Sequence, residues 1–152
     1  MAKGFYNLTT KIKDTLLLDE FVNTVTYGDI YDVDLKKQTI FPLSHFIVNT
    51  GVYNGQIWTF NVSLLCMDIV DYNKDLPTDY FQGNNNEQDV FNTQLAVINR
   101  LLDLLNRGSL HDDLYQLNGN PSIEAFVDRF ENGLAGWTVT FDVDIINDMT
   151  VC

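Results

Sequence analysis

The residues whose side chains could do chemistry are few and lie scattered along the chain. The two histidines are His45, beside Phe46 in an apolar run, and His111, which precedes Asp112 and Asp113. We interpret His45 as a packed or partly exposed strand residue rather than a general base. His111 and its two aspartates could hold a hard metal ion. A solvated acidic turn is the better interpretation, because metal ligands converge from several elements.

Neither the cysteines nor the glycines form a recognisable reactive motif. Cys66 lies in an apolar run and is expected in the core, whereas Cys152 is expected to be a terminal thiol; the pair has no zinc-site spacing and suggests no disulfide framework. No glycine-rich phosphate loop is present, and Asp29, Asp32 and Asp34 lack the glycine and final glutamate of a calcium loop. The sequence therefore predicts a protein that is not an enzyme and holds no cofactor and no metal.

Acidic residues outnumber basic ones over the whole chain. Its 152 residues include 21 Asp and Glu against 9 Lys and Arg, a formal net charge of -12. Grooves that grip nucleic acid and surfaces that dock on anionic lipid both depend on Lys and Arg, so this balance argues against both. The excess of acidic residues is compatible with a surface past which nucleic acid moves without binding, although a role in solubility alone would also explain this excess.

The length fits a single domain over residues 1–152. The first residues lack the pattern of a signal peptide, and no apolar run approaches the roughly 20 residues needed to cross a bilayer. We expect the protein to be made and used in a reducing cytoplasm, or in a particle assembled there.

A helix over residues 86–108 is the clearest predicted element. Its apolar residues recur three and four positions apart, which places them on one stripe: Phe91, Leu95, Ile98, Leu102 and Leu105. A second set widens the stripe beyond a coiled-coil seam: Val90, Val97, Leu101 and Leu104. Such a helix is expected to lie across a sheet. Asn86 is the predicted N-cap, and Gly108 is predicted to end the helix in the left-handed conformation.

Two long strands are predicted on either side of an Asn-Gly turn at residues 54–55, over residues 43–50 and 56–70. Even-numbered residues from Trp58 to Cys66 are apolar and alternate with Thr59, Asn61 and Ser63, which commits one face of the second strand to the core. Beyond residue 64 both faces become apolar. That end of the strand is therefore expected to be covered by another layer or another subunit.

The remaining segments complete an α+β pattern. A short amphipathic helix is expected over residues 5–16, a strand over 22–27, and exposed loops over about 28–38 and 71–86. Residues 109–119 read as irregular, and residues 122–130 as strand or helix, with strand favoured because Asn132-Gly133 signals a hairpin. In the last strand, over 137–145, odd-numbered residues are expected to point to the core. Trp58 and Trp137 are both expected to be core residues. The predicted fold is a single mostly antiparallel sheet, with one long helix packed across it and a short N-terminal helix.

Three stretches carry a resemblance to a known family. They are the predicted helix at residues 5–16 leading to Phe21-Val22-Asn23-Thr24-Val25, the run Thr39-Ile40-Phe41-Pro42-Leu43, and the end from Gly136-Trp137 through Phe141 to Cys152. With the acidic balance and the order of elements, they resemble the tail terminator and tail-completion proteins of tailed bacteriophages. The resemblance implies a virion structural protein that forms a ring, typically a hexamer, at the head-proximal end of the tail. Such a ring caps the tail tube, joins it to the head or neck, and lets DNA pass through an acidic lumen.

A ring subunit needs contacts with further copies of itself and with tail-tube and neck proteins. Under this resemblance, the candidate subunit-contact residues are Leu65, Met67, Ile69, Tyr72, Tyr80, Phe81, Met149 and Val151. The candidate lumen-lining acids are Asp29, Asp32, Asp34, Asp112 and Asp113. DNA is expected to pass without specific binding, and no membrane partner is expected.

Other classes of function stay open at this point. A neck or tail-completion adaptor could act as a monomer. An inhibitor whose acidic surface mimics nucleic acid would bind a basic partner tightly and in a salt-sensitive manner. A small enzyme with an acidic metal site would show a bound metal, or a hydrolytic activity that is lost when one aspartate is changed.

Overall fold

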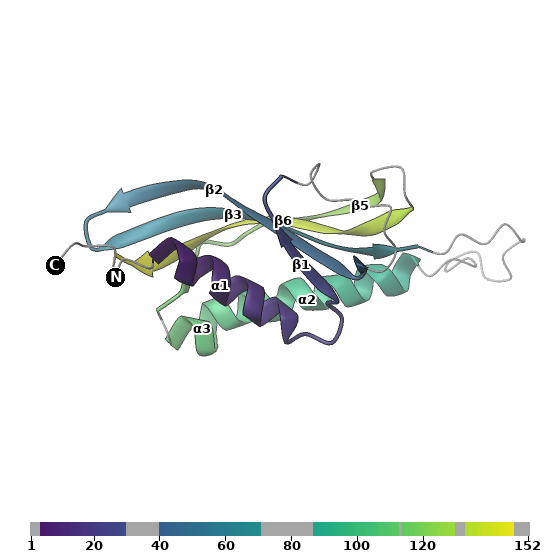
Figure 1. Cartoon of the computed structure of the whole chain (residues 1–152), viewed down its shortest axis with the longest axis horizontal. Helices are drawn as coiled ribbons and strands as arrows, with labels where there is room; N and C mark the ends of the chain where they lie inside the picture. The colour runs from purple at the N-terminus through teal and green to yellow at the C-terminus, as the bar shows by residue number, and fades with distance from the viewer. Residues whose placement is uncertain (1–3, 30–39, 71–86, 113, 130–132, 148–152) are drawn as a thin grey trace, which may run out of the picture.

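The computed structural model has a mixed six-stranded sheet with α1, α2 and α3 on one side of it (Figure 1). It describes residues 4–29, 40–70, 87–112, 114–129 and 133–147. The elements in chain order are α1 (Gly4–Leu17), β1 (Thr24–Tyr27), β2 (Leu43–Asn54), β3 (Ile57–Ile69), α2 (Glu87–Arg107), α3 (Ser109–Asp112), β4 (Gln116–Asn118), β5 (Ile123–Arg129) and β6 (Leu134–Ile146). This is the α+β fold that the sequence predicts.

The sheet runs in the order β1-β2-β3-β6-β4, and β5 also pairs with β6. β3 and β6 form its centre, antiparallel from Ile57 opposite Ile146 to Ile69 opposite Leu134. β2 and β3 form the predicted hairpin, and Gly55 takes a φ of 66° in its turn. β1 runs parallel to β2, which makes the sheet mixed. β5 is a strand, so the favoured interpretation of residues 122–130 is confirmed.

The core lies between the sheet and the helices. The inward-facing residues of β3 and β6 are buried as predicted: Phe60, Val62, Leu64 and Cys66 from β3, and Val139, Phe141, Val143 and Ile145 from β6. α1 packs Leu8, Ile12 and Leu16 onto them. Trp58 and Trp137 lie on the core face of the sheet, as predicted, but both side chains are only half-buried. Trp137 places its ring against α2 and donates from Nε1 to the Phe91 carbonyl oxygen at 2.8 Å.

The buried stripe of α2 is rotated from the predicted one. Leu95 is 37% exposed, so its place on the inner stripe is wrong. The most buried residues of α2 are Val90, Gln94, Val97, Ile98, Leu101 and Leu105. The rotation has a physical cause: α2 packs against the sheet and against α1 at once, and the stripe turns toward the groove between them.

α2 ends at Arg107, close to the predicted end, but Gly108 does not form the predicted left-handed cap. Gly108 does not take a positive φ; its N–H bonds to the Leu104 carbonyl, and its own carbonyl accepts from Asp112, so the chain continues into α3. A Cβ at Gly108 would lie 2.8 Å from the Leu104 Cα, which explains the glycine by close approach rather than by a left-handed cap. The left-handed residue is Leu114, at φ 69°. The segment over 109–119, predicted to be irregular, contains α3 and β4.

Gln94 breaks the apolar pattern of α2 and supplies a test of its packing. It is 1% exposed, and neither its Oε1 nor its Nε2 has a hydrogen-bond partner. A buried unpaired amide costs about 1–3 kcal/mol. Gln94→Met keeps a similar volume without the amide, so we expect the free energy of unfolding to rise by about 1–2 kcal/mol in urea titrations. The exposed amide of Asn99 on the same helix provides the control, because Asn99→Met should change stability by about 0.5 kcal/mol or less. A lower stability for Gln94→Met would contradict this account.

Candidate functional site

The described residues show little of the machinery of catalysis. Among them, no group of three or more His, Cys, Asp or Glu side chains is placed to hold a metal ion. Cys66 is fully buried 3.5 Å from the hydroxyl of Ser44, which confirms its predicted place in the core. Burial raises the pKa of the Cys66 thiol to about 12, so this thiol stays protonated and unreactive.

His45 is buried and ties β1 to β2. Its Nε2 donates to the Gly28 carbonyl oxygen at 2.6 Å, and since a carbonyl only accepts, this bond fixes the proton on Nε2. Nδ1 then accepts from the Thr26 hydroxyl at 2.7 Å. Burial lowers the pKa of His45 below its ordinary 6.5, against the opposing effects of the Gly28 bond and the Asp29 charge. The ring is a neutral, fully bonded strand residue, as the sequence predicts, and not a base.

This burial makes stability depend on pH. Because folding lowers the pKa of His45, the unfolded chain takes up the proton more readily, so stability is complete above about pH 6.5 and falls as the pH drops. The free energy of unfolding is expected to fall as the pH drops below about 6.5, by at most about 1.4 kcal/mol per pH unit from this group. His45→Gln should lose this part of the fall, whereas His111→Gln should keep it. Equal pH slopes for the wild type and His45→Gln in denaturant titrations would refute the assignment.

The sheet face away from the helices is polar over its hairpin half, and two carboxylates are fixed on it. Asp142 Oδ1 accepts from Asn61 Nδ2 at 2.9 Å. Asp144 Oδ1 accepts from the Thr59 hydroxyl at 2.5 Å and from Asn118 Nδ2 at 3.3 Å. We call this surface the polar face; its residues are Asn49, Thr59, Asn61, Ser63, Asn118, Thr140, Asp142 and Asp144.

Hydrogen bonds run across the polar face from strand to strand. Asn49 donates from Nδ2 to Asn61 Oδ1 at 3.0 Å and to Ser63 Oγ at 2.7 Å, and Ser63 lies 3.3 Å from the Thr140 hydroxyl. Both N–H groups of the Asn49 amide, and one of the two on Asn61, are therefore used inside the network. The polar face thus bears two fixed carboxylates, and several of its donors bond within its own network.

Cations are absent from the three central strands. β2, β3 and β6 contain no Lys and no Arg, and their acidic residues are Asp68, Asp142 and Asp144. The basic residues that the structure describes lie on α1, α2 and β5: Lys11, Lys13, Arg100, Arg107 and Arg129. The outward alternation of the last strand predicts the direction of Asp142 and Asp144, but not the network that fixes them.

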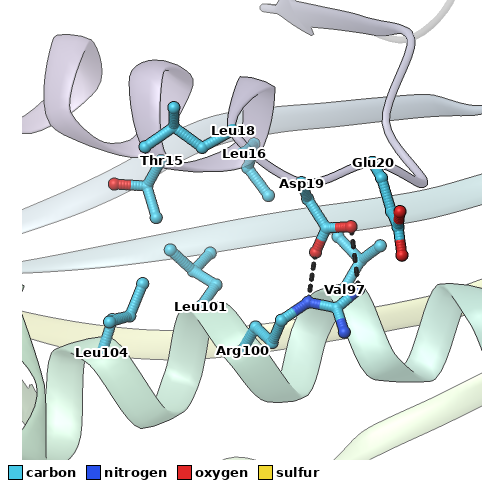
Figure 2. Close-up of a pocket in the computed structure, with 9 residues that line it drawn as sticks. All are labelled: Thr15, Leu16, Leu18, Asp19, Glu20, Val97, Arg100, Leu101 and Leu104. Atoms are coloured by element: carbon cyan, nitrogen blue, oxygen red, sulfur yellow. Dashed lines mark hydrogen bonds and ion pairs between the residues drawn. The ribbon is translucent and has the colours of Figure 1, made fainter.

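A pocket of about 410 Å³ lies where the end of α1 meets the middle of α2 (Figure 2). It is lined by the apolar side chains Leu16, Leu18, Val97, Leu101 and Leu104 and by Thr15, Asp19, Glu20 and Arg100. Arg100 points from α2 to the Asp19 carboxylate, as Figure 2 shows, with Nε and Nη2 at 2.5 and 2.8 Å from its two oxygens.

The guanidinium of Arg100 is occupied by structural contacts. It lies 5.6 Å from the centre of the Phe21 ring in addition to its two bonds with Asp19, and the Asp19 hydrogen bond raises the pKa of Arg100. Asp19 also accepts from the Phe21 backbone N–H at 3.0 Å. These contacts fasten the turn after α1 onto α2, so we assign the pocket a structural role rather than a role in anion binding.

The apolar end of β3 is covered by its own chain. Met67 is fully buried in a small cluster with Phe41, Leu43 and Leu134, against which Ile40, Leu65, Ile69 and Phe126 pack. The side chains around Met67 come from neighbouring strands of the same sheet and from the segment just before β2, so Met67 is buried without a second subunit. Met67 has no exposed surface for a second subunit, which corrects its choice as a contact residue. Leu65 and Ile69 are half-buried, and a subunit contact there stays a prediction.

The other predicted site residues are only partly described. Asp29, after β1, and Asp112, at the end of α3, are both exposed, but they belong to different layers and the structure does not bring them together. Eight predicted residues lie outside the described part of the chain: Tyr72, Tyr80, Phe81, Met149, Val151, Asp32, Asp34 and Asp113. Their assignments stay predictions.

Comparisons with known proteins do not assign the chain to a family. No protein-family model matches the chain, and no curated protein matches it significantly. None of the helices within the described residues is long and apolar enough to cross a membrane. Any function is therefore inferred from the surfaces described above.

Proposed function

We propose that this chain is a ring-forming virion structural protein, a tail terminator that caps the tail tube and joins it to the head or neck. The observation that carries the proposal is the polar face of the sheet. It bears two carboxylates fixed by hydrogen bonds from its own amide and hydroxyl groups, and the strands that form its centre contain no Lys or Arg.

These properties suit a surface past which a DNA duplex moves. A duplex carries about one negative charge per 1.7 Å of its axis, and proteins hold it by placing Lys and Arg against the phosphates. Asp142 and Asp144 repel phosphates instead, and both N–H groups of the Asn49 amide are already bonded within the face. In the proposed ring the polar face lines the lumen, and the helices with their cations face outward.

Asp29 and Asp112, with Asp32, Asp34 and Asp113, stay as further candidates for the rim of that lumen. The net charge of -12 fits the same purpose, since excess acid keeps DNA from adhering anywhere on the ring. The proposed partners are further copies of the chain and the proteins of the tail tube and neck.

The proposal predicts a closed ring. We expect light scattering over a range of concentrations to give a species of about six chains, or the chain to be found at the head-proximal tail end of purified virions if assembly needs the tube. Negative-stain images of the large species should show a lumen wide enough for a duplex. A chain that stays monomeric and is absent from virions would contradict the proposal and favour the monomeric inhibitor.

A charge reversal tests the assigned face. The double variant Asp142→Lys/Asp144→Lys should bind duplex DNA at low salt in mobility-shift experiments, with an affinity that falls steeply as salt rises. The wild type should not bind. Asp14→Lys/Asp89→Lys changes the net charge equally at exposed helix positions, and is the matched control. Equal binding by both double variants would mean that net charge, and not the polar face, determines DNA passage.

A further inference from the structure

One edge of the sheet is open beside the hairpin half of β2. β1 pairs only with Leu43 to Phe46 of β2 and then leaves at Gly28, which has a φ of 111°. Within the described residues no strand pairs with residues 47–54 on this side, and residues 49–57 are exposed. Figure 1 shows the β2–β3 hairpin extending well past β1. We call this vacant strand position beside residues 47–54 of β2 the lane.

Aromatic side chains gather on the helix side of the lane. Tyr53, Tyr27 and Tyr6 are 65%, 47% and 76% exposed. A chain of ring contacts links Tyr53 to Trp58, Trp58 to Phe60, Phe60 to Phe5 and Phe5 to Tyr27, with centroids 5.5–6.5 Å apart. An apolar groove of about 320 Å³ between α1 and β1 continues this surface. The lane therefore offers backbone hydrogen-bonding groups and an exposed apolar floor together.

The charge of the lane indicates what can fill it. No Asp, Glu, Lys or Arg occurs from Leu43 to Met67, in a chain whose net charge is -12. Two copies of such a chain repel one another over most of their surfaces, and the lane is a stretch of strand edge that adds no charge to this repulsion. Edge strands that avoid pairing usually carry charges or Pro, and past the bulge between Val48 and Thr50 the lane edge has neither. These features favour a second copy over a basic partner.

A second copy also offers a strand edge to place there. β5 pairs with β6 on one side, and no other described strand pairs with it. It lies across the sheet from the lane. Glu124 and Ala125 are exposed and Val127 is 47% exposed. In the register with β6, Ala125 and Val127 share the helix side of the sheet, so they would meet the aromatic floor of the lane.

We infer that β5 of one copy enters the lane of the next and extends the sheet from copy to copy. Two different edges on opposite sides of one sheet make a head-to-tail contact, which closes into a ring when the rotation between copies is suitable. The inference rests on the proposed function, because it names the lateral contact of that ring.

Two edge variants and their mixture test the pairing. Val52→Lys places a charge on the β2 edge that borders the lane, and Val127→Lys places one on β5. Each variant should lack the large species expected for the wild type and remain monomeric in light scattering. Mixed together, they should form a one-to-one dimer, because one variant keeps an intact lane and the other an intact β5. Circular dichroism of each variant should match the wild type, which establishes that the edges and not the fold have changed.

The controls separate this inference from the proposed function. Val52→Thr adds no charge and should keep the wild-type mass, as should Leu18→Lys, at a helix-side position that is 88% exposed. A large species that survives both edge variants would overturn the inference and leave the ring proposal standing. Loss of the large species in Val52→Lys but not in Val127→Lys would mean that the lane of one copy pairs with the lane of another copy, and not with β5. A wild type that stays monomeric at every concentration would overturn the edge pairing, and the presence of the chain on virions would then decide the ring proposal separately.

Discussion

The long antiparallel pairing of β3 with β6 is the constraint on which the rest of the structure depends. It joins Ile57–Ile69 to Leu134–Ile146, so segments separated by α2 share one sheet. At Gly136 the two strands approach so closely that a Cβ would lie 2.0 Å from the Cys66 carbonyl oxygen. Only glycine allows the ladder to continue through this point. With the register fixed, the core face receives α1 and α2, and Trp137 bonds to α2 through the Phe91 carbonyl.

The same register divides the opposite face of the sheet into two halves. At one end Met67 lies opposite Gly136, and the surrounding apolar side chains are covered by Phe41 and Phe126 of the same chain. At the other end Asn61 lies opposite Asp142 and Thr59 opposite Asp144, and these pairs form hydrogen bonds. A slip of one residue would turn Val62 outward and Asn61 into the core, so burial of one face fixes the polar pattern of the other.

The fold was predictable where the periodicity was strong, and the errors have physical causes. The alternation in residues 58–66 and 137–145 located the core face of both central strands, because a half-buried strand repeats every two residues. Leu95 and Gly108 were misplaced because the rotation of α2 and its continuation into α3 depend on α1 and on the close approach to Leu104. The bonds from Asn61 to Asp142 and from Thr59 to Asp144 join residues 81 and 85 positions apart in the chain, and no local pattern encodes them. The lane depends on where β1 ends relative to β2, and this is likewise set by the tertiary structure and not by a local pattern.

The distribution of charge connects these surfaces. Of the chain's 21 acidic residues, β2, β3 and β6 contain only Asp68, Asp142 and Asp144, and these strands hold no Lys or Arg. These three strands therefore carry little charge in a strongly acidic molecule, and the hairpin edge of β2 has no charged residue at all. Repulsion between copies disfavours contacts through the charged surfaces and leaves the uncharged edge as the place of closest approach. Edge-to-edge contact, in turn, keeps the polar face uncovered, because strands that pair side by side bury their edges and not their faces. The proposed assembly through the edges is thus compatible with a free acidic face, because both would follow from one arrangement of strands.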